Sequence, residues 1–287
     1  MSKKLQYDLE IKSVKSFFKS VDYLAAVRLQ CELLPEYMPN KWDVKEPIKQ
    51  LFDPDHLEQL IYPNGDTDTI DWKRTEKPKA TGSWRRSWGR SRGLSDSTHA
   101  TIEISVHESA HQEKLLAYLK AASVLNEADI GALDSNVDKG KELARFVYHL
   151  PTGYTSTTGI YAGIDLSTHT LRHWLPDMPW AVVFGSAYVR MFGKERLLTC
   201  PAYKVEDIGL EMVFIQLTSN IEDIYKKYDE VMQARALAKK HLGEECFFKP
   251  ELAYDYKTRA STNVTEEEIA AKQGKVFRVP VFELKPD

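Results

Sequence analysis

The sequence switches repeatedly between two hydrophobic periods, and this constrains the fold more than any other feature. Apolar and polar residues alternate over residues 5–11 and again over 102–106, the period of a half-buried strand. After each of these segments, apolar residues recur three and four positions apart, over 17–31 and 115–122, the spacing of an amphipathic helix. Strands and helices mixed without a strict strand–helix–strand rhythm predict an α+β fold.

The second half of the chain continues this mixture of strand and helix patterns, but it does not repeat the sequence of the first half. A hairpin is expected around Gly209, and a last strand over residues 276–284. Between them, a long helix should begin with a capping box formed by Ser219 and Glu222 and end at Gly243. The 287 residues allow one large domain or two modest ones.

We expect two small lobes, each a mostly antiparallel sheet with packed helices. The N-terminal α+β lobe would comprise residues 1–135 and the C-terminal α+β lobe residues 136–287, with a single domain as the alternative. The boundary falls in a polar stretch that contains Gly140.

Composition excludes several classes of protein. With 39 Lys and Arg against 42 Asp and Glu, the net charge of −3 is too balanced to indicate a nucleic-acid-binding protein. No apolar run approaches the ~20 residues of a membrane helix, and the N-terminus has no secretory signal. Three scattered cysteines, Cys31, Cys200 and Cys246, fit neither a disulfide framework nor a cysteine zinc site. We therefore expect a cytoplasmic protein without a cofactor.

One motif matches the sequence pattern of a known type of metal site. His107 and His111, with Glu108 between them, spell the zincin pattern, in which two histidines on one helix bind zinc and the glutamate activates water. However, a strand runs directly into His107, and Ser109 with Gln112 looks like a capping box that opens the next helix. The two histidines would then not share a helical face. A zinc-dependent hydrolase is kept as the alternative function.

The most basic and aromatic part of the chain is the segment 82–93. Arginine interleaved with tryptophan is typical of binding hot spots in protein interfaces, and it also suits stacking on RNA bases. A third interpretation is structural: the tryptophans fill the core while the arginines stay in water. The candidate partner-binding residues here are Trp84, Arg85, Arg86, Trp88, Arg90 and Arg92. RNA binding is the weakest of the three because the whole chain is mildly acidic.

Two stretches, which together cover about half of the chain, resemble a known family. The first contains Pro35-Glu36-Tyr37-Met38-Pro39, Trp42, Phe52-Asp53-Pro54, Trp72-Lys73-Arg74 and Trp84-Arg85-Arg86. The second contains Trp180, Phe184-Gly185, Tyr188-Val189, Phe192-Gly193-Lys194, Leu198, Pro201-Ala202-Tyr203, Phe214-Ile215-Gln216-Leu217-Thr218 and His241-Leu242-Gly243. These stretches resemble the immunity proteins of bacterial polymorphic-toxin and type VI secretion systems, and most nearly the group named immunity protein 52.

The resemblance implies a non-catalytic α+β inhibitor in the cytoplasm of the producing cell. Its partner would be a cognate toxin effector, often a nuclease in such systems, whose active site it would occlude with about 800 Å² or more of surface. The resemblance transfers no interface residue. The segment from Trp84 to Arg92 is the first candidate interface, and an acidic surface on the long helix is the second. That acidic surface consists of Glu222, Asp223, Asp229 and Glu230.

Overall fold

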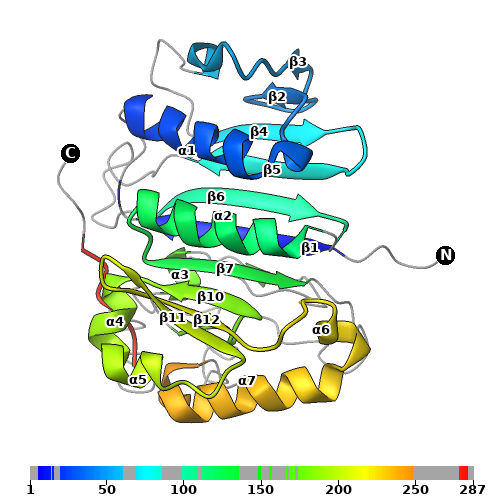
Figure 1. The fold of residues 1–287 in the computed structure, drawn as a ribbon. Coiled ribbons are helices and arrows are strands. Elements are labelled where there is room, and N and C mark those ends of the chain that lie inside the picture. Colours follow the sequence, from blue (N-terminus) through cyan, green and yellow to red (C-terminus); the bar gives the residue numbers. More distant parts are fainter. Residues whose placement is uncertain are drawn as a thin grey trace.

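In a computed structural model, the chain forms one large antiparallel sheet with helices on both faces (Figure 1). The structure describes residues 6–13, 15, 20–60, 69–85, 99–108, 111–135, 148–149, 155–156, 166, 168–171, 174–247 and 278–283. The large sheet has ten strands in the order β11-β12-β10-β7-β1-β6-β5-β4-β2-β3. The predicted α+β class is confirmed.

The bounds of the elements are as follows. The large sheet contains β1 (Tyr7–Ser13), β2 (Lys41–Asp43), β3 (Gln50–Leu51), β4 (Thr69–Arg74), β5 (Ala80–Arg85), β6 (Ala100–Val106), β7 (Ile130–Ser135), β10 (Ala181–Phe184), β11 (Lys204–Gly209) and β12 (Met212–Gln216), and a separate pair contains β8 (Tyr148–His149) and β9 (Thr155–Ser156). The helices are α1 (Ser20–Leu33), α2 (Gln112–Leu125), α3 (Thr168–Leu171), α4 (Ser186–Phe192), α5 (Lys194–Leu198), α6 (Asp223–Lys226) and α7 (Tyr228–Leu242). Three short 3₁₀ helices are η1 (Pro35–Tyr37), η2 (Leu57–Leu60) and η3 (Glu244–Cys246).

Strand β1 lies in the middle of the sheet and has the predicted alternation. Its Tyr7, Leu9 and Ile11 side chains are buried on one face. It pairs with β6 on one side and with β7 on the other, and β7 also pairs with β10. Strands from before and after residue 135 therefore share one hydrogen-bonded sheet. The domain boundary at residue 135 itself stays a prediction.

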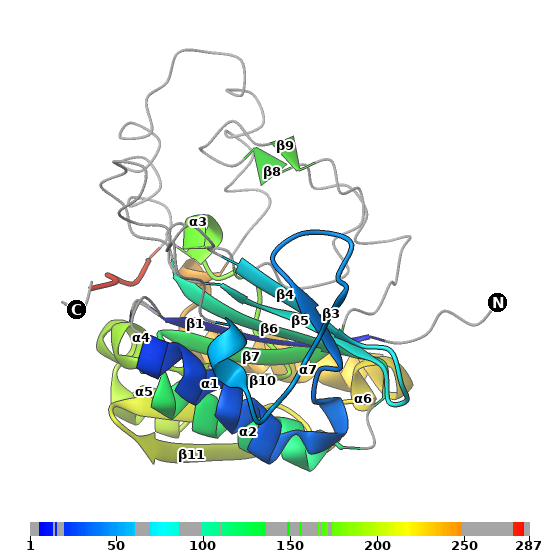
Figure 2. The same cartoon turned by 90° about the horizontal axis from the view of Figure 1, so that it is seen from above.

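Helices α1 and α2 cover one face of the sheet. Figure 2 shows the two helices lying together on one side of the strands. Beneath them, the indoles of Trp72 and Trp84 pack with ring centroids 5.7 Å apart. The cross-strand neighbour of Trp72 is Gly82, where a Cβ atom would lie 2.4 Å from the indole and 2.1 Å from the carbonyl oxygen of Glu103. Only glycine leaves room for this packing.

A second core lies on the opposite face, behind β7, β10 and β12. Val182 and Phe184 of β10 point into it, together with Tyr188 and Phe192 of α4 and Leu242 of α7. The rings of Phe184 and Phe192 are 5.4 Å apart. Among the described residues, this core lies against β7, β10 and β12, and the side chains that β1, β6, β5 and β4 direct to the same face are polar.

The long helix predicted between Ser219 and Gly243 is two helices. Lys227 interrupts it with φ −134° and ψ 50°, outside the helical region, between α6 and α7. The predicted capping box does not form, because Glu222 ion-pairs with Lys226 and makes no side-chain cap. A side chain from α2 replaces it: Gln112 donates to the carbonyl oxygen of Ser219.

The predictions of a hairpin and of a last strand in the second half of the chain have different outcomes. The hairpin around Gly209 is confirmed as β11 and β12, and Gly209 has the positive φ of 86° that favours glycine. The last strand, predicted over 276–284, is wrong for the described residues 278–283, which form no strand. Their backbone instead contacts η3, since Arg278 N–H donates to the carbonyl oxygen of Glu245 at 2.9 Å.

Candidate functional site

The part of the sheet not backed by the second core has a row of charged and hydroxyl side chains. These residues lie on β1, β6, β5 and β4, on the face opposite α1 and α2, because they alternate with the buried residues that contact those helices. We call this surface the polar face. It consists of Asp8, Glu10, Lys12, Thr69, Asp71, Lys73, Thr81, Ser83, Arg85, Thr101, Glu103 and Ser105.

The register of the strands aligns carboxylates along the polar face. Glu10 lies directly opposite Glu103, Glu103 opposite Ser83, and Ser83 opposite Asp71. The row ends at Asp43 of β2, opposite Asp71. Four carboxylates from four strands therefore lie in one line across the sheet.

Cations lie in the neighbouring row. Lys12 is 5% exposed, forms an ion pair with Glu10, and donates to Thr101 Oγ1 at 3.2 Å. Thr101 is directly opposite Arg85 on β5. Lys12 and Arg85 thus flank one hydroxyl beside the carboxylate row, and the face has both signs of charge in fixed positions.

Asp71 is the member of the carboxylate row whose charge is electrostatically unfavourable in the folded chain. Like charges placed directly opposite on neighbouring strands are destabilising. Burial raises the pKa of Asp71 above its usual value, and the negative charges of Glu46 and Glu103 raise it further, while Arg85 opposes them. Glu103 accepts one hydrogen bond, from Ser83 Oγ at 3.1 Å. Asp71 therefore costs folding stability when it is ionised. Elsewhere in the row, desolvation of Asp43 is outweighed by hydrogen bonds that lower its pKa, and Glu10 pairs with Lys12.

We expect Asp71→Asn to stabilise the protein. At neutral pH the substitution should raise the free energy of unfolding by about 0.2–1 kcal/mol, the scale of a like-charge cross-strand pair. Because the folded-state pKa of Asp71 is raised, its destabilising effect appears as the pH rises through that pKa, and the advantage of the variant should vanish in acid. Urea unfolding at several pH values measures both effects. Asp55→Asn on the exposed surface is the matched control, and equal effects of the two substitutions would contradict the account.

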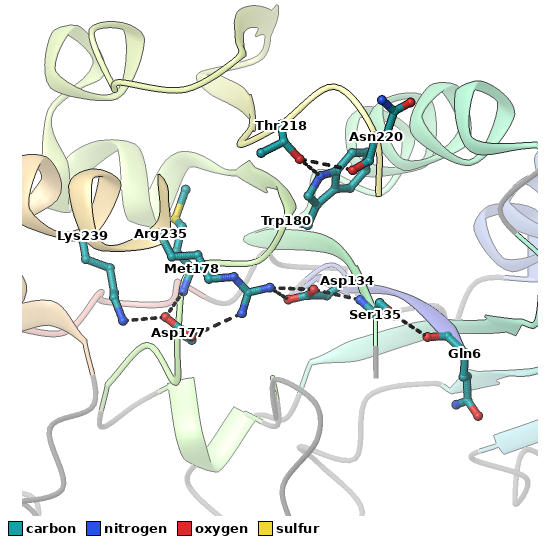
Figure 3. A network of polar contacts seen from close by, with 10 residues as sticks. All are labelled: Gln6, Asp134, Ser135, Asp177, Met178, Trp180, Thr218, Asn220, Arg235 and Lys239. Atoms are coloured by element: carbon teal, nitrogen blue, oxygen red, sulfur yellow. Dashed lines mark hydrogen bonds and ion pairs between the residues drawn. The ribbon is translucent and has the colours of Figure 1, made fainter. Parts of the chain in front are cut away.

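A buried ion network borders the polar face at β7. Asp134 is directly opposite Asp8, and both of its oxygens accept from Nη2 of Arg235 on α7 at 2.8 Å (Figure 3). Arg235 also contacts Asp177 at 3.3 Å, and Asp177 binds Lys239 at 2.7 Å. These bonds hold α7 against the end of β7, so the network fixes one edge of the polar face.

The electrostatics of this network follow from burial. Burial raises the pKa of Asp134, and the nearby charge of Asp177 raises it further, while the charge of Arg235 only partly offsets this. Burial acts on Asp177 too, but there the charges of Arg235 and Lys239 outweigh it and lower the pKa. Arg235 therefore favours the ionised form of both carboxylates.

A second buried polar cluster joins three segments at the other end of the sheet. His99 Nδ1 lies 2.8 Å from Thr168 Oγ1, and His99 Nε2 lies 3.2 Å from Asp129 Oδ2. The backbone N–H of His99 also donates to Thr168 Oγ1, at 3.0 Å. All three residues are less than 9% exposed, and Phe282 packs against the imidazole with centroids 4.6 Å apart. The arrangement ties α3 and the 278–283 segment to the starts of β6 and β7.

The structure separates two of the predicted interface residues. Trp84 is 1% exposed, and its indole N–H donates to Gln30 Oε1 at 2.9 Å, so it belongs to the core and not to an exposed surface. Its neighbour Arg85 points to the other side of the strand and lies on the polar face. The prediction that Trp84 is an exposed anchor is therefore corrected. The remaining predicted residues, Arg86, Trp88, Arg90 and Arg92, lie outside the described part of the chain.

The zincin-like motif does not place His107 and His111 together within one helix. Helix α2 begins at Gln112, so His111 is its N-cap and His107 follows β6. The ring of His111 packs edge-on against Tyr37, with centroids 5.6 Å apart. Within the described residues, no three His, Cys, Asp or Glu side chains are placed to hold a metal ion together. Ser109, half of the capping box predicted there, is outside the described residues.

The candidate acidic surface on the long helix is divided by the break at Lys227. Glu222 and Asp223 lie at the start of α6, where Asp223 is buried, and Asp229 and Glu230 lie in the first turn of α7. Glu222 is engaged with Lys226 and Glu230 with Lys227, so two of the four charges already have cationic neighbours.

The elements together define an α+β protein whose ten-stranded antiparallel sheet is covered by helices on one face and partly by a second core on the other. In the described residues, no helix is both long and apolar enough to cross a bilayer. No family model matches the sequence, and no curated protein matches it. Among solved structures, the Pseudomonas aeruginosa T6SS protein PA0821 aligns over 91% of this chain and 88% of that chain, with a TM-score of 0.44 and 10% sequence identity.

Proposed function

We propose that this chain is an immunity protein that binds a cognate toxin effector and neutralises it by occluding its active site. The polar face is the observation that carries the proposal. It has carboxylates aligned in fixed register with cations beside them, and among these carboxylates the charge of Asp71 is held at a cost to stability. Charges that destabilise the free protein are expected where a partner supplies the opposite charges.

The physical effect of such a surface is on partner choice and on the rate of encounter. Complementary charges steer association and penalise partners with the wrong charge pattern. Glu10, Glu103 and Asp71 would face basic groups on the toxin, such as those that line a groove for a phosphate-containing substrate. Arg85 would pair with acidic groups beside that groove. The proposed toxin is therefore a nuclease, and the proposed place of action is the cytoplasm of the producing cell.

The family resemblance and the polar face support the proposal at different places in the molecule. The residues of the second resembling stretch cluster in the cores: Phe184, Tyr188 and Phe192 belong to the second core, and Trp180 and Phe214 are fully buried as well. These residues determine the fold. A partner surface must be sought among residues outside that set, which is where the polar face lies.

The proposed protein is not an enzyme and needs no cofactor, in contrast to the zinc hydrolase alternative. A hydrolase would need His107 and His111 to approach one metal ion, whereas only His111 lies at a helix start. RNA binding would need cations to dominate the surface, whereas the central row of the polar face is acidic. Neither alternative has a supporting arrangement of side chains in the described residues.

Co-expression tests the proposal. The product of the neighbouring gene should arrest growth when it is produced alone in a laboratory host, and this chain should restore growth and co-purify with it. Stoichiometric zinc in the purified chain, together with hydrolytic activity that Glu108→Gln abolishes, would instead establish the hydrolase. A neighbour that is not toxic, or a toxic one that this chain does not neutralise, would overturn the proposal.

A further inference from the structure

Strand β11 ends the large sheet and has an open side. In the described part of the chain, its one strand neighbour is β12. Lys204 and Asp207 are close to half exposed, and the large apolar side chains of Tyr203 and Leu210 at its two ends are 63% and 61% exposed. A strand edge with free backbone groups is a template on which another strand can pair.

The backbone hydrogen bonds identify which groups point to the open side. The N–H of Leu217 donates to the carbonyl oxygen of Trp180 at 2.9 Å, so this residue directs its N–H toward β10. Hydrogen-bonded and non-hydrogen-bonded positions alternate along an antiparallel strand, so the next residue, Gln216, faces β11. Its partner Lys204 and, two residues on, Glu206 therefore direct their N–H and C=O toward β12, while Val205 and Asp207 direct theirs outward.

Outward groups on alternate residues restrict how a second β11 can pair with the first. In an antiparallel pair of identical strands, the outward residues must lie opposite outward residues. Three such registers exist near the middle of the strand: Asp207 opposite itself, Val205 opposite Asp207, or Val205 opposite itself. The first places two aspartates together and the second places Glu206 opposite Glu206. Only the third places Lys204 of each copy opposite Glu206 of the other, and so pairs opposite charges.

We infer that two copies of this chain associate edge to edge through β11, with Lys204 of each copy opposite Glu206 of the other. Val205 lies on the two-fold axis opposite itself, where the two copies exchange two backbone hydrogen bonds, and the two Lys204–Glu206 pairs lie beside it at non-hydrogen-bonded positions. Tyr203 falls opposite Asp207 of the second copy. The association joins two ten-stranded sheets into one continuous sheet.

An irregularity near the end of β11 limits how many residues can pair between the two copies. The register of β11 against β12 shifts between Asp207 and Gly209, which interrupts regular pairing at that end. The contact is therefore short, and a reversible dimer is expected rather than an obligate one. The polar face lies on β1, β6, β5 and β4, at a distance of three strands or more from β11, so the dimer leaves it open.

Sedimentation velocity over a range from ~1 µM to ~500 µM tests the inference. The unmodified chain should shift from monomer to dimer as the concentration rises. K204E and E206K should each remain monomeric where the unmodified chain is dimeric, because each places like charges together. An equimolar mixture of the two variants should regain the dimer, because every pair across the axis then has opposite charges again.

The matched control is K240E, the same charge reversal on the exposed side of α7, which should dimerise as the unmodified chain does. Thermal unfolding confirms that each variant is folded. The check is needed because both variants break the ion pair between Lys204 and Glu206 within one chain, and E206K also breaks the ion pair with Lys120. A chain that is monomeric throughout, a K204E variant that dimerises normally, or a variant mixture that stays monomeric would each overturn the inference. These outcomes are independent of whether any toxin is bound.

Discussion

Arg235→Met is expected to lower the free energy of unfolding by about 3–5 kcal/mol, the cost of breaking a buried ion pair by removing one partner. The guanidinium binds both oxygens of Asp134 at 2.8 Å, and both side chains are about nine-tenths buried. Methionine fills much of the same volume but leaves Asp134 and Asp177 without this cation. The loss is therefore electrostatic rather than a packing defect.

Urea unfolding measures this loss, and pH dependence identifies its cause. The pKa of Asp177 is lowered in the folded protein, where the charges of Arg235 and Lys239 outweigh burial, so its contribution to stability is present at neutral pH and disappears as the pH falls. The deficit of the variant should shrink in acid, where the carboxylates no longer need a cation. Arg190→Met is the control, because Arg190 is exposed and its ion pair with Glu283 spans 3.5 Å. A deficit no larger than that of the control would contradict the account.

Glu103→Lys is expected to weaken the complex with the toxin by about 30-fold or more, equivalent to about 2 kcal/mol. Glu103 lies at the centre of the carboxylate row, opposite Glu10 on one side and Ser83 on the other. A cation there would repel the basic groups that the row is proposed to bind. Within the free chain, the same cation would remove the like-charge contact with Glu10, so the fold should tolerate it.

Glu113→Lys is the matched control for this variant. It is the same substitution on the exposed side of α2, which covers the opposite face of the sheet. Isothermal titration calorimetry with the purified toxin domain, inactivated at its catalytic site, gives both affinities. Equal binding by the two variants would place the interface elsewhere. Thermal unfolding shows whether each variant is still folded.

Local elements were predictable from the sequence because their signals are local. The alternation that predicted β1, the spacing that predicted α2, and the glycine that predicted the β11–β12 hairpin each lie within a dozen residues. The absence of the capping box was missed, because contacts from α2 shape the chain before α6. A capping motif that looks complete in the sequence still competes with side chains from elsewhere in the fold.

The candidate site depended on information that no local pattern contains. Glu10, Glu103 and Asp71 are far apart in the chain, and only the strand register aligns them. The basic segment did indicate Arg85, because composition marks unusual surface residues. It could not separate Arg85 from Trp84, since the side of a strand that faces the core depends on its neighbours. The ion network of Arg235 likewise joins residues about 100 positions apart.

Growth of cells that produce the toxin is the measurement that tests the central claim most directly. The toxin is co-expressed with the unmodified chain, with Glu103→Lys, or with Glu113→Lys, each at the same protein level. The account predicts full rescue by the unmodified chain and by Glu113→Lys, and weak or no rescue by Glu103→Lys. Failure of the unmodified chain to rescue would contradict the immunity function, and full rescue by Glu103→Lys would contradict the polar face as its binding surface.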